Sequence, residues 1–323
     1  MVLVAWGGAP SPAPGLPRIH AFGDARYDAG QWLPLVTQAR ALPLRGRPAQ
    51  RPWNAYWWPY NAGGLNHRWL SPHELSPIEK LDAVSGHAAH EASRWEAASH
   101  PSNVPWGGQC DGYATAAIME PEPRFPVLDQ GVCFASGDVK GLLGAIYMGD
   151  MSGQRVDVLG RDVVQDDRRA DDLDPATFHL ALTNVMGLHH RGLYLDVGKH
   201  GEIYNKVVAS YVSRVRRRGR RLWVTTTLQI VTYRLAPAIA STPGALHVAP
   251  KTLRYQLALD GAGAIVPGRG AWLGHSVRNH PTAMKIPRGT AVRTGVSDPF
   301  IDVARVERLA ARSAAASRAE CWP

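Results

Sequence analysis

The change in hydrophobic spacing along the chain constrains its fold more than any other feature. Ser76-Pro77-Ile78-Glu79 has the order of a capped helix start, with Ser at the N-cap, Pro at the first helical position and Glu at the third. Apolar residues then recur every three or four positions, which predicts an amphipathic helix to about residue 98. A small, Ala-rich segment over 110–119, ended by Pro121, predicts a buried helix.

From about residue 178 the spacing becomes that of β-strands. Segments rich in β-branched and aromatic residues predict strands over 178–185, 192–198, 203–212, 222–235 and 253–260. Asp260-Gly261 is typical of a hairpin turn, and the apolar spacing after Asp302 predicts a closing helix to about residue 319. Helices followed by strands predict an α+β fold, with the helix over 110–119 packed on an antiparallel sheet.

The chain divides by composition near residue 50. Residues 1–50 are rich in Pro, Gly and Arg with little periodicity, which predicts a lead-in, and residues 51–323 are expected to form the main domain. The first residues lack the basic and apolar regions of a signal peptide. No run approaches the roughly 18 apolar residues of a membrane helix, so we expect no membrane span.

The net charge of +9 raises the question of nucleic-acid binding. The densest basic run, residues 214–221, lies between two expected strands and contains Gly219, so a solvated hairpin tip is the better interpretation. The chain carries no zinc-finger, RRM or KH signature, and no nucleic-acid partner is expected.

Three cysteines show no metal-ligand spacing. Cys133 and Cys321 could pair in an oxidising compartment, which the sequence does not decide, and Cys110 would then be the free thiol.

Cys110 lies in a setting that favours reactivity. Gly107 and Gly108 permit a tight turn into the helix that follows, which places Cys110 at the helix N-terminus. The helix dipole and the free N–H groups there stabilise a thiolate and a developing oxyanion. A cysteine at a glycine-flanked helix start is nevertheless more often a plain small residue.

Two further residues have the types that a cysteine nucleophile requires. His179 and Asp196 occupy alternate positions of two expected strands, and a hairpin centred between Gly187 and Leu188 would place them directly opposite each other. Asp196 would then orient His179 as the general base. Asn205 is a second candidate for the orienting residue, and a structural His–Asp pair without chemistry is the alternative.

These segments together resemble the transglutaminase elicitor family. The resemblance rests on the run from Trp106 to Ile118, on Phe178-His179-Leu180-Ala181-Leu182-Thr183-Asn184, on Asp138-Val139-Lys140-Gly141-Leu142-Leu143 and on Arg254-Tyr255-Gln256-Leu257-Ala258-Leu259-Asp260. It extends from about residue 53 to about residue 290. The chain departs from the family pattern at Asp111, Tyr113 and Tyr204, which leaves the acyl-acceptor preference open.

The resemblance implies a papain-like or transglutaminase-like fold with a Cys110–His179–Asp196 triad. It implies that a thioester enzyme cross-links glutamine side chains to lysine or other primary amines on protein substrates, and that such a protein is secreted. Trp106 and Gln109 are the expected substrate-binding residues. A cysteine hydrolase on the same fold (an amidase, deamidase or peptidase) is the alternative, and a non-enzymatic surface protein is a third hypothesis.

The sequence itself requires no cofactor, but the resemblance implies calcium dependence. The visible oxygen-rich segment is Asp166, Asp167, Asp171, Asp172 and Asp174, whose spacing differs from that of an EF-hand. A solvated acidic loop is the better interpretation of this segment, and the metal-binding residues stay unassigned.

Overall fold

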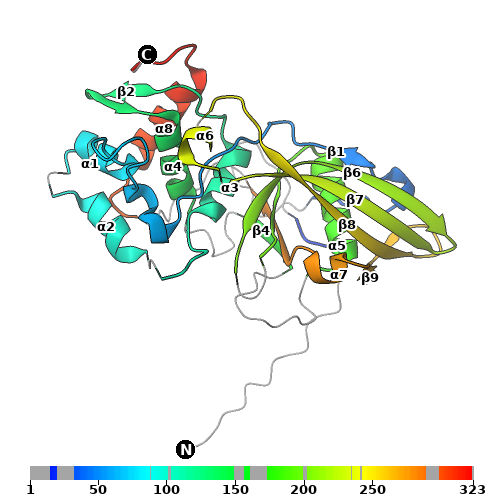
Figure 1. The fold of residues 1–323 in the computed structure, drawn as a ribbon. Coiled ribbons are helices and arrows are strands. Elements are labelled where there is room, and N and C mark those ends of the chain that lie inside the picture. Colours follow the sequence, from blue (N-terminus) through cyan, green and yellow to red (C-terminus); the bar gives the residue numbers. More distant parts are fainter. Residues whose placement is uncertain are drawn as a thin grey trace, which may run out of the picture.

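The computed structural model describes residues 15–19, 33–87, 89–100, 103–148, 156–160, 173–198, 202–233, 235–240, 242–288 and 298–321. Helices α1–α4 and α8 gather at one end of the molecule and the long strands extend from the other (Figure 1). We call these two parts the helical half and the sheet half.

The helical elements are α-helices, short 3-10 turns and a π-helix. The α-helices are α1 (Pro77–Ser85), α2 (Glu91–Ser99), α3 (Cys110–Met119), α4 (Ser136–Tyr147), α5 (Pro175–Ala181), α6 (Pro237–Ala240), α7 (Ser276–Asn279) and α8 (Val303–Ala315). The 3-10 turns are η1 (Ala39–Ala41), η2 (Tyr60–Ala62) and η3 (Gly64–Asn66), and a π-helix, η4 (Leu182–Leu188), continues α5.

One antiparallel sheet dominates the strands. Its order is β4-β10-β5-β6-β7-β8-β9, with β1 also paired to β6, and β2 and β3 form a separate pair. The strands are β1 (Arg45–Gly46), β2 (Val127–Asp129), β3 (Val132–Phe134), β4 (Val156–Gly160), β5 (Tyr194–Asp196), β6 (Asn205–Arg218), β7 (Arg221–Val231), β8 (Val248–Leu259), β9 (Ile265–Trp272) and β10 (Ala283–Pro287). The predicted α+β fold with an antiparallel sheet is confirmed.

The predicted start of the first helix is confirmed, but its end is not. The Ser76 hydroxyl accepts from the Glu79 N–H and the Glu79 carboxylate accepts from the Ser76 N–H, as a capping box requires. The helix then stops at Ser85 because Gly86 takes a left-handed conformation with φ of +73°. The expected single helix is therefore two, α1 and α2.

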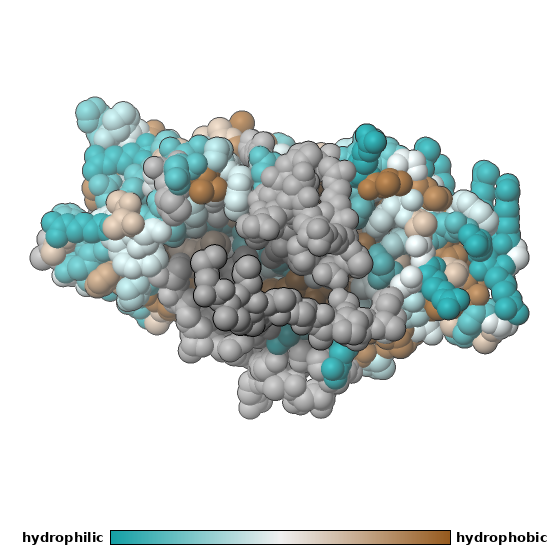
Figure 2. All heavy atoms as spheres, turned by 90° about the horizontal axis from the view of Figure 1, so that it is seen from below, coloured by the Kyte–Doolittle hydropathy of each residue, from teal (hydrophilic) through white to brown (hydrophobic). Residues whose placement is uncertain are grey.

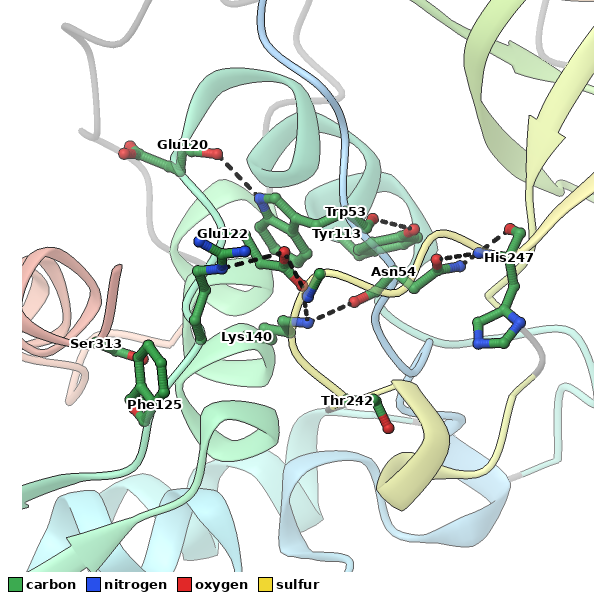
Figure 3. Close-up of polar contacts among 12 residues, drawn as sticks. Trp53, Asn54, Tyr113, Glu120, Glu122, Phe125, Lys140, Thr242, His247 and Ser313 are labelled. Atoms are coloured by element: carbon green, nitrogen blue, oxygen red, sulfur yellow. Dashed lines mark hydrogen bonds and ion pairs between the residues drawn. The ribbon is translucent and has the colours of Figure 1, made fainter. Parts of the chain in front are cut away.

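Helix α3 packs closely against α4. A Cβ on Gly112 would lie 2.1 Å from the Gly144 carbonyl oxygen, so only glycine permits this approach. The chain before and after these helices is tied to them by polar contacts (Figure 3). Lys140 of α4 donates to the Asn54 carbonyl at 3.0 Å and pairs with Glu122 at 2.9 Å.

The aromatic stretch after residue 50 forms a wall of the core in the helical half. Trp53 and Trp58 are almost fully buried, and the Tyr113 hydroxyl donates to the Trp53 carbonyl at 3.0 Å (Figure 3). These two tryptophans therefore pack in the core of the helical half. The predicted lead-in also contributes structure, because Arg45 and Gly46 pair with Val212 and Tyr211 of β6.

The strands that join the two halves separate two hydrophobic cores. Along β5 and β6, Tyr194 and Val207 belong to the core of the helical half. Leu193, Leu195 and Val208 belong to the core of the sheet half. Because side chains alternate along a strand, one face of these strands is turned toward α3 and the other toward α5.

The basic run forms the predicted hairpin tip. Arg218 pairs with Arg221 across a turn in which Gly219 has φ of +58°, and the arginines around it are exposed. The corresponding end of the surface is hydrophilic (Figure 2). These features support a solvated tip.

A disulfide joins Cys133 of β3 to Cys321, 188 residues later, and leaves Cys110 as the free cysteine among the described residues. It fastens the segment after α8 to the helical half, where α8 also packs against α4. No helix in the described ranges is both long and apolar enough to span a membrane.

The predicted strand over 178–185 is wrong. Asp174 caps α5 by accepting from the N–H groups of Ala176 and Thr177, and Pro175 occupies the first helical position. The residues from Phe178 to Gly187 are all buried, along a short helix and its π-helical continuation. The hairpin centred on Gly187 and Leu188 therefore does not exist.

Candidate active site

Cys110 begins helix α3, as predicted. Gly108 fits tightly beneath Trp57, where a Cβ would lie 2.8 Å from the indole ring. The Gln109 N–H then donates to the Trp57 carbonyl at 2.8 Å, and this bond fixes the turn that leads into the helix. The glycines thus serve a close approach of two chain segments.

The thiol of Cys110 is buried, with 6% of the residue exposed. Burial raises its pKa to about 11, so the resting group is a thiol at neutral pH. The Asn205 backbone N–H and the Lys285 ammonium favour the thiolate, whereas Asp111 and Asp196 disfavour it. A nucleophilic role for Cys110 would therefore require a base.

Three strands present polar residues to this thiol on a single sheet face. Register pairs Asp196 of β5 with Asn205 of β6, and Lys285 of β10 with Tyr194 of β5. Tyr194 faces the helical half, so its paired neighbours and alternate positions along these strands face it too. The two candidates for the orienting residue, Asp196 and Asn205, thus lie opposite each other beside α3.

Asp111 connects this sheet face to α3. Its Oδ1 accepts from Lys285 Nζ at 3.0 Å, from Asn205 Nδ2 at 2.9 Å and from the Tyr194 hydroxyl at 3.1 Å. Three donors on one carboxylate oxygen, one of them an ammonium, lock the start of the helix onto the sheet. Neither Asp111 nor Lys285 was predicted, although a lysine among apolar residues in Ala283–Pro287 is a signal of a buried charge pair.

Asp196 is held equally firmly. Its Oδ1 accepts from the N–H groups of Gly198 and Tyr204, each at 2.8 Å, and its Oδ2 accepts from the Thr282 hydroxyl at 3.3 Å. Asp196 and Asp111 are therefore each held in place by several donors on neighbouring elements.

His179 lies far from this group. Its Nδ1 is hydrogen-bonded to the Tyr255 hydroxyl at 2.8 Å, and a chain of hydroxyls continues through Thr226 to Ser213 of β6. Ser213 is eight residues along β6 from Asn205, which corresponds to roughly 26 Å at ~3.3 Å per residue. The expected pairing of His179 with Asp196 is wrong, because His179 lies on α5 and faces the other core.

The two expected substrate-binding residues differ in exposure. Trp106 is half-buried in the turn before Cys110. Gln109 is 1% exposed, and its Oε1 lies near Gly144 of α4 without a hydrogen-bond partner among the described residues. Gln109 therefore supports the turn from inside, whereas Trp106 stays a candidate for contact with substrate.

An imidazole that the sequence reasoning missed lies on the other side of this turn. His100 stacks on Tyr60 with ring centroids 4.0 Å apart, and its Nδ1 is 2.9 Å from the buried Glu96 carboxylate. Tyr60 donates its backbone N–H to the Gly107 carbonyl. The pKa of the Tyr60 hydroxyl is raised by burial and further by the charges of Glu96, Cys110 and Asp111. One aromatic ring thus separates a carboxylate–imidazole pair from the surroundings of Cys110.

The residues that come closest to a metal site fit calcium poorly. Asp82, His87 and Glu91 bring one ligand atom each within 4.8 Å of one another. The Asp82 carboxylate already accepts from the N–H groups of Ala92 and Ser93 at the start of α2, and an imidazole is a poor ligand for a hard cation. Of the predicted acidic segment, Asp174 caps α5 and the other aspartates lie outside the described residues.

Comparisons with known proteins agree with the predicted resemblance. Residues 86–220 match the sequence profile of the transglutaminase elicitor family. The crystal structure of the GP42 transglutaminase from Phytophthora sojae is similar in fold, with a TM-score of 0.70 and 21% sequence identity over 87% of this chain and 94% of that one. No curated protein sequence matches the chain. Cys110 and its strand neighbours Asp196 and Asn205 all lie within the matched range.

Proposed function

We propose that this chain is a protein-glutamine γ-glutamyltransferase with Cys110 as its nucleophile. The observation that carries the proposal is a cysteine at a helix start facing the Asn205 N–H and a fixed set of charges. The family match and the fold shared with a transglutaminase support the same reaction. The proposal includes a papain-like or transglutaminase-like fold, which a cysteine at the start of α3 beside an antiparallel sheet supports.

Proton transfer falls to His100 in this proposal. Asp111 and Asp196 already accept several hydrogen bonds from neighbouring groups, and His179 belongs to the other core. His100 Nδ1 lies 2.9 Å from the Glu96 carboxylate but is not aligned for a hydrogen bond with it, and the imidazole stacks on Tyr60 beside the Cys110 turn.

The reaction then proceeds in two steps. In the proposed first step the Tyr60 ring moves from between His100 and Cys110, His100 takes the Cys110 proton, and the sulfur attacks the carboxamide carbon of a glutamine side chain. The C–N bond breaks, the proton is returned to the departing ammonia, and a thioester remains. A lysine amine attacks the thioester, loses a proton to His100, and Cys110 leaves as the thiol, which closes the cycle.

The Asn205 N–H donates toward the sulfur, and Lys285 offsets the charge that forms there. The depth of Cys110 favours a long side-chain carboxamide over a main-chain peptide bond, because only a thin group reaches a thiol that is so little exposed. Trp106 is the candidate wall of the approach. The disulfide between Cys133 and Cys321 supports an oxidising, secreted location.

The test is incorporation of a fluorescent primary amine into a glutamine-bearing protein, together with ammonia release. Wild type is expected to do both, and Cys110→Ala is expected to do neither while keeping the wild-type unfolding temperature. Ammonia release without incorporation would replace the transferase by the hydrolase. Full activity of Cys110→Ala would remove the proposal altogether.

A further inference from the structure

A pocket of about 430 Å³ opens on the sheet half, away from Cys110. Buried leucines line it (Leu42, Leu222 and Leu259), together with the turn that joins β8 to β9. Its size lies within the range of small-molecule sites. The proposed reaction uses none of these residues.

His179 lines this pocket although only 3% of the residue is exposed. Its Nδ1 is occupied by Tyr255, and among the described residues its Nε2 has no hydrogen-bond partner. Because His179 lines the pocket and its second nitrogen has no described partner, Nε2 is available to a molecule that enters the pocket.

The hydroxyl chain determines what Nε2 offers. Ser213, Thr226 and Tyr255 lie in a row with O···O distances of 2.8 and 2.7 Å, and Tyr255 reaches His179 at 2.8 Å. If Ser213 donates to Thr226, Thr226 to Tyr255 and Tyr255 to Nδ1, every hydroxyl hydrogen is used. The reverse order leaves the Ser213 hydrogen without a described acceptor. In the first order Nδ1 accepts a hydrogen bond, so the neutral imidazole carries its hydrogen on Nε2. Nε2 can then donate to a ligand in the pocket.

The outer part of the pocket is cationic. Arg40 and Arg217, both exposed, line it together with Val215. The pocket thus combines a hydrogen-bond donor at its buried side, an apolar middle and two guanidinium groups toward solvent. A ligand that fits has an oxygen acceptor, an apolar body and an anionic end.

We propose that this pocket binds small oxo-carboxylic acids, with the carbonyl oxygen on His179 Nε2, the body over Leu222 and Leu259, and the carboxylate toward Arg40 and Arg217. The site is independent of the Cys110 chemistry. It gives His179 a binding role in the sheet half.

Calorimetric titration of the full chain with three matched probes tests this. The probes are 5-oxo-5-phenylpentanoate, 5-phenylpentanoate, which lacks the ketone, and the methyl ester of the first, which lacks the charge. Wild type is expected to prefer the oxo acid about 3- to 10-fold over the acid without the ketone, as one hydrogen bond gives. The ester is expected to bind more weakly than the acid.

Variants assign each part of the preference. His179→Phe is expected to bind both acids equally, Arg217→Ala to lose the preference for acid over ester, and Val215→Trp, which fills the space from its half-exposed side, to bind no probe. Cys110→Ala is expected to bind like wild type. Absence of binding to wild type, a ketone preference that persists in His179→Phe, or unchanged binding to Val215→Trp would each overturn the proposal.

Discussion

Cys110 and His179 are both almost fully buried, yet their surroundings differ in kind. Around Cys110, α3 and three strands bring together Asp111, Asp196 and Lys285. Around His179, a row of neutral hydroxyls leads away from the ring. Charged groups can stabilise the changes of charge in acyl transfer. A row of neutral hydroxyls instead fixes which ring nitrogen of His179 carries the hydrogen. The contrast teaches that burial of a reactive residue type does not by itself indicate catalysis.

The largest expected effect is on the rate of amine incorporation when His100 or His179 is replaced. His100→Asn is expected to reduce amine incorporation by about 10²- to 10⁴-fold, the usual contribution of a general base. His179→Asn is expected to retain activity within about 3-fold once the folded fraction is matched. Steady-state rates with the fluorescent amine measure both, and the opposite ranking would return the catalytic role to His179.

A large effect on stability is expected at the charged site. Lys285→Met leaves the Asp111 carboxylate buried without its ammonium partner, which costs about 3–5 kcal/mol of unfolding free energy. Lys285→Met combined with Asp111→Asn is expected to recover most of that loss. Urea unfolding measures both variants, and a loss below about 1 kcal/mol for Lys285→Met would show that the pair adds little.

The neutral site is expected to show a pH signature of somewhat smaller size. Burial lowers the pKa of His179 to about 4 in the folded chain, while a free histidine titrates near 6.5. The unfolded chain takes up this proton as the pH falls below 6.5 and the folded chain does not, so stability is present above 6.5 and is lost toward pH 4. The difference in unfolding free energy between wild type and His179→Gln should shrink by about 3 kcal/mol over this window. A pH-independent difference would contradict the buried neutral state.

The smallest effect is expected within the hydroxyl row. Thr226→Val keeps the shape of the side chain but removes the donor to Tyr255, at a cost of about 1 kcal/mol. Ser213→Ala, at the end of the row, should cost less. Thermal unfolding distinguishes the two, and equal losses would mean that the row is not ordered from Ser213 to His179.

Local signals allowed much of the fold to be predicted from the sequence. Gly107-Gly108 before Cys110 and the Ser76 capping box each depend on a few neighbouring residues, and the structure has both features. Asp196 was predicted from alternation along its strand. The same rule failed for His179, because a short apolar run is compatible with both a strand and a helix. Asp174-Pro175, a cap residue followed by proline, is the local signal that favours the helix.

The rest depended on tertiary register. Lys285 reaches Asp111 across 174 residues, and only the pairing of β10 with β5 brings them together. His100 meets Tyr60 through the packing of the loop before α3. No spacing in one sequence reports such contacts, since they depend on which strand lies beside which.

The disulfide has a consequence for biosynthesis. The helical half contains α1–α4 and also α8, so its last helix leaves the ribosome only after the whole central sheet. At roughly 5–20 residues per second, Cys321 follows Cys133 by on the order of 10–40 s. During that interval Cys110 and Cys133 are both reduced within the same nascent segment. Early burial of Cys110 by α4 and the first strands would therefore keep its thiol from pairing with Cys133.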